Sequence, residues 1–187
     1  LITMPARLGA HLDMPPPAFA EEALLALLRV SAPRFIKWDA RPGNAVARED
    51  GTVAWFDWEH CGARAWLDDA AWLLCDEYAD ATKAAEGRLL ARHLDAFADG
   101  RGADEAAAYL AAFGTFHMCV RLGLILKYKE RGEWWDAAYC LERDKIGVTR
   151  AQALLTARRA ARWAGRAEPV RTLATWFEAV AARIEEM

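Results

Sequence analysis

The chain has 187 residues, with 24 basic and 27 acidic side chains and a formal net charge of −3. This near-neutral charge gives no general reason to expect nucleic acid or an anionic membrane as a partner. No apolar run approaches the ~20 residues of a membrane-spanning helix, and no charged leader precedes an apolar core. We therefore expect a cytoplasmic protein that is one domain or the larger part of a two-lobed protein, with no nucleic-acid or membrane partner. We interpret its 4 cysteines as reduced thiols.

The first third of the chain is expected to hold a short helix and three strands. Residues 1–17 look irregular because prolines interrupt them, and a helix over 18–30 must end before Pro33. Strands are predicted over 34–37, 44–48 and 52–56. The last two form a hairpin, because Asp50-Gly51 between apolar runs is a strong signal for a tight turn.

After residue 67 the apolar residues recur almost throughout at helical spacing. Helices are expected from Asp68 to about Ala81, over 83–100, from Tyr109 to near Gly132, and over 133–144. A capping box formed by Thr149 and Gln152 opens the next helix, which runs to Gly165. Glu168-Pro169 opens the last one, whose buried stripe is Val170, Leu173, Phe177, Val180 and Ile184. The fold class is therefore α+β and mostly α.

Three polar residues follow apolar strands in an order that suits phosphoryl transfer. Asp39 and Asn44 enclose a Pro-Gly turn, and the hairpin then brings Asp57 toward the same place. Phosphoryl transfer needs a carboxylate to orient and deprotonate the attacking hydroxyl, and oxygen ligands to hold Mg²⁺ on the nucleotide phosphates. Taken singly, each residue could equally be an ordinary turn or strand-end residue.

The segment "KWDARPGNAVAREDGTVAWFDWEHCGARAWLDDAAWLL" resembles the catalytic segment of the aminoglycoside phosphotransferase and choline kinase family, which has a protein-kinase-like fold. The resemblance implies a C-terminal lobe over 1–187, with the catalytic loop and metal-binding hairpin at 34–60. It implies that Asp39 is the catalytic base, that Asn44 and Asp57 bind Mg²⁺ and ATP, and that Asp69 supports the catalytic loop. Lys37 stands where the family has His, Trp38 where it has Gly, and Ala65-Trp66 where it has Asp-Pro.

A kinase of this type also needs an N-terminal lobe that covers the phosphates. Nothing before Asp39 matches such a lobe, so we expect it to be missing from this chain and the chain alone to be inactive. Its absence would expose an apolar seam that favours a homodimer.

Several further residues are candidates for substrate contacts. Glu59 and His60 follow Asp57 and either face the phosphates and substrate or form a solvated loop. Trp134, Trp135 and Asp136 suit a bound cation, or else pack in the core. The acidic residues Asp76, Glu77 and Asp80 form either a cation-binding patch or a solvated helix face.

We therefore expect an ATP- and Mg²⁺-dependent phosphotransferase that acts on a hydroxyl of a small molecule, such as an aminoglycoside, choline or a sugar. The alternative is a non-catalytic, pseudokinase-like binding module without a nucleotide lobe. A third possibility, a metal-dependent hydrolase using the two Asp residues, lacks an activated nucleophile or a pair of water-binding histidines.

Overall fold

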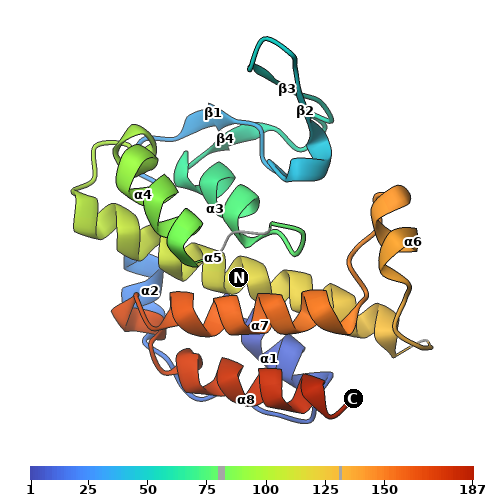
Figure 1. The fold of residues 1–187 in the computed structure, drawn as a ribbon. Coiled ribbons are helices and arrows are strands. Elements are labelled where there is room, and N and C mark those ends of the chain that lie inside the picture. The colour runs from blue at the N-terminus through green and yellow to red at the C-terminus, as the bar shows by residue number, and fades with distance from the viewer. Residues whose placement is uncertain (80–82, 131) are drawn as a thin grey trace.

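The computed structural model describes residues 1–79, 83–130 and 132–187. It is mostly helical, with two small antiparallel sheets at one end of the helical layers (Figure 1). In chain order its elements are α1 (Met4–Ala10), α2 (Glu21–Leu27), β1 (Arg34–Ile36), the 3-10 turn η1 (Pro42–Asn44), β2 (Ala45–Ala47), β3 (Val53–Trp55), β4 (Gly62–Arg64), α3 (Leu67–Cys75), α4 (Lys83–Phe97), α5 (Ala103–Lys129), α6 (Ala137–Glu142), α7 (Arg150–Ala164), η2 (Glu168–Val170) and α8 (Leu173–Glu185). The predicted α+β, mostly α class is confirmed.

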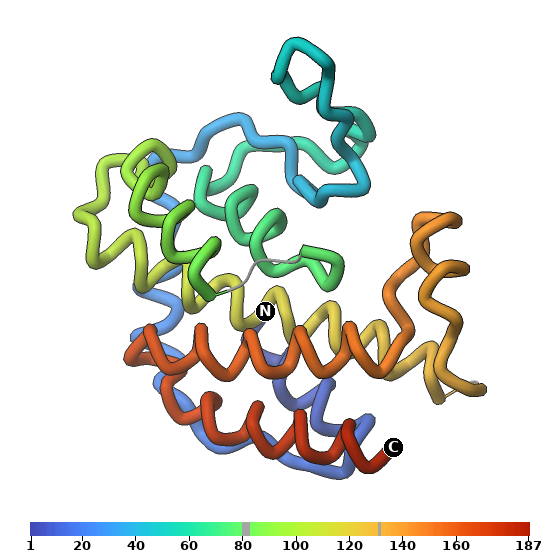
Figure 2. Tube along the Cα trace, viewed as in Figure 1, coloured from blue at the N-terminus to red at the C-terminus, as the bar shows by residue number. Residues whose placement is uncertain are grey.

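The core is organised around α5, which contacts α1, α3, α4 and α7 (Figure 2). The predicted stripe of the last helix is buried against α7, and Thr149 caps the α7 N-terminus by accepting from the Gln152 amide. Among the described residues, α5 is also long and apolar enough to cross a membrane, a length that the sequence analysis missed. Because 83% of its most apolar 18-residue stretch is buried in the fold, the length and apolar character of α5 are explained by its place in the core.

Both sheets are two-stranded. The hairpin pairs β2 with β3, Ala45 opposite Trp55, and Gly51 takes a φ of 81° at its turn, so the predicted hairpin is confirmed. β1 pairs with β4, a strand that was not predicted because Gly-Ala-Arg carries no β-branched or aromatic residue. The segment between β1 and β2 connects the two sheets, and it carries Asp39 and Asn44.

Several helix boundaries differ from expectation: α2 is shorter than 18–30, α5 begins at Ala103 instead of Tyr109, and α6 spans Ala137–Glu142 instead of 133–144. Two further differences have a local cause. Residues 4–10 form α1, where an irregular segment was predicted, because Pro5 occupies a first-turn position that tolerates proline. α3 ends at Cys75 instead of continuing toward Ala81. Asp76 has an extended backbone, and its side chain and that of Glu77 turn inward to ion pairs. Residues 80 and 81 lie outside the described residues.

Candidate functional site

The structure joins Asp39 to Asn44 directly. The Asn44 Nδ2 group donates to the Asp39 carboxylate Oδ2 at 2.8 Å and to the Asp39 backbone carbonyl at 3.0 Å. The η1 turn brings the amide back beside Asp39 in this way. Within the described residues the Asn44 Oδ1 atom accepts no hydrogen bond, so this oxygen is free to bind a cation.

Lys37 links the Asp39 loop to the end of the hairpin. Its Nζ group donates to the backbone carbonyls of Asp39, at 3.1 Å, and of Asp57, at 2.8 Å. These two carbonyl oxygens therefore lie within twice a hydrogen-bond length of each other. The Lys37 side chain is buried, and its charge is satisfied by main-chain acceptors. Lys37 thus joins the backbones of Asp39 and Asp57, and Asn44 is joined to this pair through its hydrogen bonds to Asp39.

Asp69 fastens the loop to the helices. From the first turn of α3 its carboxylate accepts the backbone N–H groups of Lys37, at 2.9 Å, and of Trp38, at 2.8 Å. Burial raises the pKa of Asp69, and the two amide donors act against that rise. The supporting role that the resemblance implies for Asp69 is compatible with these two hydrogen bonds.

Trp38 anchors the loop by its side chain. Its ring packs edge-on against Trp72 of α3 and Phe113 of α5, and the Arg64 guanidinium lies 3.9 Å from its centroid. Trp38 and Asp39 have φ values of 51° and 53°, in the left-handed region that non-glycine residues rarely occupy. Such backbone strain persists where surrounding contacts fix it, and it is concentrated at functional sites.

Asp57 lies where the hairpin ends and also has a left-handed backbone, with a φ of 58°. Its carboxylate is exposed, and it accepts no hydrogen bond from the described residues. Among these residues no three His, Cys, Asp or Glu side chains form a metal-binding group. The predicted pair of Asn44 and Asp57 would therefore leave most coordination positions of Mg²⁺ to phosphate oxygens and water, as is usual for this ion.

A buried ionic layer lies below the loop. Arg121 of α5 forms a two-pronged ion pair with Glu77, at 2.7 and 2.5 Å, and Glu77 also accepts the Gly147 amide at 3.2 Å. Burial alone would raise the pKa of Glu77, but the Arg121 pair outweighs it and the net direction is downward. Burial would lower the pKa of Arg121, but the hydrogen bonds and charge of Glu77 outweigh burial, and the pKa is raised, with smaller contributions from Asp76 and Asp39.

Arg41 extends the layer to the other side of the loop. It lies 3.5 Å from the Asp76 carboxylate and 3.0 Å from that of Asp144. A Cβ atom on Gly43 would lie 2.8 Å from Asp144, so the segment after α6 adjoins the turn before Asn44. Asp76 and Glu77 are buried ion-pair partners, so of the two alternatives the solvated face is wrong for both, and the cations that they bind are Arg41 and Arg121 of the chain itself. Asp80 lies outside the described residues.

The remaining predicted residues lie away from these contacts. Glu59 and His60 are exposed and lie 3.3 Å from each other. Asp136 caps the N-terminus of α6 by accepting the Tyr139 amide at 2.9 Å. Trp134 packs on the core, and the cation over its ring, at 5.5 Å, is the chain's own Lys129.

Trp135 belongs to an aromatic cluster with Tyr128 and Tyr139, at centroid distances of 5.7 and 5.9 Å. The position of the Trp135 side chain is therefore explained by packing, which is one of the two alternatives that the sequence left open.

Sequence reasoning missed the parts played by Lys37, Arg41 and Asp144. Lys37 was noted only as a departure from the family pattern. A lysine directly after the apolar pair Phe35-Ile36 and directly before the loop was the available signal. Asp144 is 103 residues from Arg41 in the chain, and no local pattern indicates that they meet.

Comparison of the chain with protein-family models, with curated proteins and with solved structures finds no match.

The role of Lys37 can be tested by Lys37→Met, which keeps the buried stem and removes the donor. We expect a loss of about 1.5–3 kcal/mol of unfolding free energy, because carbonyls bonded to a charged group would lose their donor. We also expect faster amide exchange around residues 39–44. Urea unfolding and hydrogen exchange measure these effects.

The matched control for this change is Lys127→Met, at an exposed position on α5, which should leave both measurements unchanged. Equal protection of residues 39–44 in Lys37→Met and in the unsubstituted chain would show that Lys37 does not hold the loop.

Proposed function

We propose that the chain is the C-terminal lobe of an ATP- and Mg²⁺-dependent phosphotransferase acting on a small-molecule hydroxyl. The observation that carries the proposal is the braced Asp39 loop: Asn44 donates to the Asp39 carboxylate, Asp69 holds the loop, and Lys37 joins its backbone to that of Asp57. Phosphoryl transfer depends chiefly on positioning and charge stabilisation, and a carboxylate held in this way supports such a role.

Each of the three residues has a separate part in this reaction. Asp39 accepts the proton of the acceptor hydroxyl through the carboxylate oxygen that Asn44 does not bind. The Asn44 Oδ1 atom and the Asp57 carboxylate would hold Mg²⁺, which supplies neutralisation of the phosphate charge when bound. The helical layer fixes the backbone of the Asp39 loop through Asp69, and such support gives a catalytic group a defined geometry.

The surface beside the site is compatible with a flat nucleobase. Val46 and Phe56 are 53% and 48% exposed, and they lie on the hairpin that joins Asn44 to Asp57. Exposed apolar side chains next to free oxygen ligands suit a ligand that has an aromatic ring and phosphates. The proposal assigns the covering side of this ligand site to a separate N-terminal lobe.

The test extends the chain upstream with residues encoded by its own gene. The extended protein is incubated with Mg-ATP and a panel of aminoglycosides, choline, amino alcohols and sugars, and phosphate transfer is followed by ADP release. We expect acceptor-dependent release that needs Mg²⁺, and no change in melting temperature when Mg-ATP is added to the 187 residues alone. A folded extended protein that binds ATP but transfers no phosphate would favour the non-catalytic binding module.

A further inference from the structure

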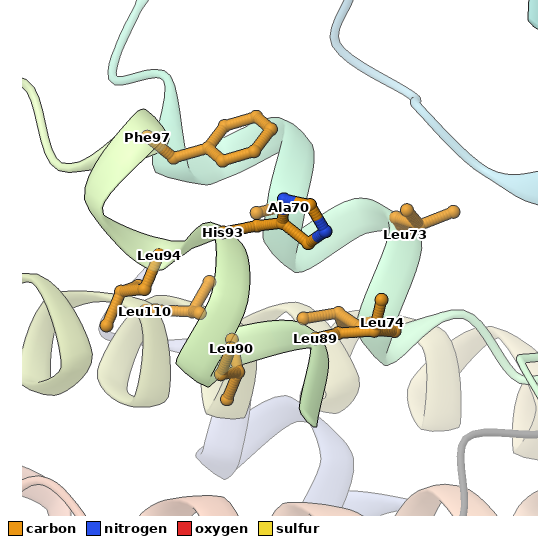
Figure 3. A pocket seen from close by; sticks show the side chains of 9 residues that line it. All are labelled: Ala70, Leu73, Leu74, Leu89, Leu90, His93, Leu94, Phe97 and Leu110. Atoms are coloured by element: carbon orange, nitrogen blue, oxygen red, sulfur yellow. The ribbon is translucent and has the colours of Figure 1, made fainter. Parts of the chain in front are cut away.

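A cavity opens between α3, α4 and α5, and it shares Ala70, Leu73 and Phe97 with a hollow on the side of Lys37 and Asp69. Its volume is ≈ 300 Å³, at the lower end for ligand pockets. The described residues that line it are apolar except for one histidine: Ala70, Leu73, Leu74, Leu89, Leu90, His93, Leu94, Phe97 and Leu110. Figure 3 shows His93 projecting from α4 toward α3, between Phe97 and Leu89.

The mouth of the cavity exposes leucine side chains that the protein does not cover. Leu73 is 39% and Leu89 is 45% exposed, although both face the apolar cavity. The spacing of Leu89, Leu90, Leu94 and Phe97 gave α4 an apolar side in the sequence, and that side is only partly buried. An apolar ligand in the cavity would remove this surface from water, at about 25 cal/mol per Å².

The rim of this cavity is cationic. Arg88 and Arg92 lie one helical turn apart on α4, and with Leu89 and His93 they line an adjoining surface hollow. Within the described residues neither arginine forms an ion pair. The acidic residues nearest in the helix do not neutralise them, because Glu86 is buried and paired with Arg162 and Arg166, and Asp95 makes no ion pair with Arg92.

We propose that this cavity binds a medium-chain carboxylate, such as a fatty acid of about the length of decanoate. Its hydrocarbon tail fills the apolar cavity, and its carboxylate lies at the mouth against Arg88, Arg92 and His93. Guanidinium groups match carboxylates with paired hydrogen bonds, and the apolar walls offer no partner to a polar tail. The charge of the rim selects an anion over a neutral or cationic amphiphile of equal length.

The experiment is calorimetric titration of the 187-residue chain with decanoate, below its micelle-forming concentration, next to decanol and decyltrimethylammonium. We expect saturable binding of decanoate at one site and at least tenfold weaker binding of the other two. The double variant Arg88→Glu/Arg92→Glu should weaken decanoate binding at least tenfold. Ala70→Leu, which fills the cavity and leaves Arg88 and Arg92 unchanged, should also weaken decanoate binding at least tenfold.

The matched control is Arg7→Glu/Arg150→Glu, which makes the same change in net charge at two exposed positions away from the cavity and should bind decanoate as the unsubstituted chain does. Circular dichroism and melting temperature establish that each variant is folded. Decanol binding as tightly as decanoate would overturn the assignment of a carboxylate. Decanoate binding that both Ala70→Leu and the Arg88/Arg92 variant leave unchanged would overturn the site.

Discussion

Asp39→Asn is expected to reduce phosphate transfer by the upstream-extended protein by about 10²–10⁴-fold, the range for loss of a general base. Asparagine has nearly the same size as aspartate, and its Oδ1 atom can still accept from Asn44 Nδ2, as the carboxylate does at 2.8 Å. The loop therefore keeps its geometry and loses only the group that accepts the proton. We expect the loss in kcat with little change in the melting temperature.

The matched control for this prediction is Asp13→Asn. Asp13 has a φ of 54°, close to the 53° of Asp39, so the two changes place asparagine in the same backbone conformation. Asp13 is exposed and lies next to α1, away from the site, so we expect full activity. Activity of Asp39→Asn within a few-fold of the unsubstituted protein would exclude Asp39 as the base.

Glu77→Gln is expected to lower the unfolding free energy by about 3–5 kcal/mol, because it leaves the buried Arg121 guanidinium without its counter-ion. The double variant Glu77→Gln/Arg121→Met should recover most of this loss, since it removes the uncompensated charge as well. Urea unfolding of the 187-residue chain measures both effects. The control is Glu186→Gln, which breaks the exposed pair with Arg183 at 3.3 Å and should cost no more than about 1 kcal/mol.

The effect of Glu77→Gln should depend on pH with a defined sign. Since folding lowers the pKa of Glu77 below its ordinary value of 4.5, its carboxylate contributes stability above that pH. The contribution is lost as the pH falls through the folded pKa, so the difference between the variant and the unsubstituted chain should shrink below about pH 4.5. A difference that stays constant from pH 7 to pH 3 would show that the cost comes from packing.

Patterns of short range predicted the helical part well. The stripe from Val170 to Ile184 and the capping box at Thr149 depend on spacings of three or four residues, and such spacings can be recognised directly in the sequence. β4 and α1 were missed for the opposite reason. β4 exists because β1 needs a partner, and α1 exists because it packs against α5.

In the candidate site, too, the local turns could be predicted from the sequence and the long-range contacts could not. From sequence, the turn at Pro42-Gly43 indicates that Asn44 returns to Asp39, and the hairpin at Asp50-Gly51 indicates that Asp57 returns toward the same place. No sequence pattern shows that the Lys37 ammonium lies between two carbonyls, because this position depends on where the hairpin ends in space. The buried pair of Glu77 and Arg121 is separated by 44 residues, and the sequence offered an acidic patch in its place.

The anchoring of Trp38 between α3 and α5 has a consequence for assembly. The contacts that hold the Asp39 loop in its left-handed conformation come from Trp72, Phe113 and Asp69, which belong to the helical layer. The loop therefore takes its conformation from the helical layer alone. Under the proposed function, a phosphate-covering lobe supplied as a separate polypeptide would bind a preformed surface, and phosphate transfer is then expected to be restored by complementation in trans.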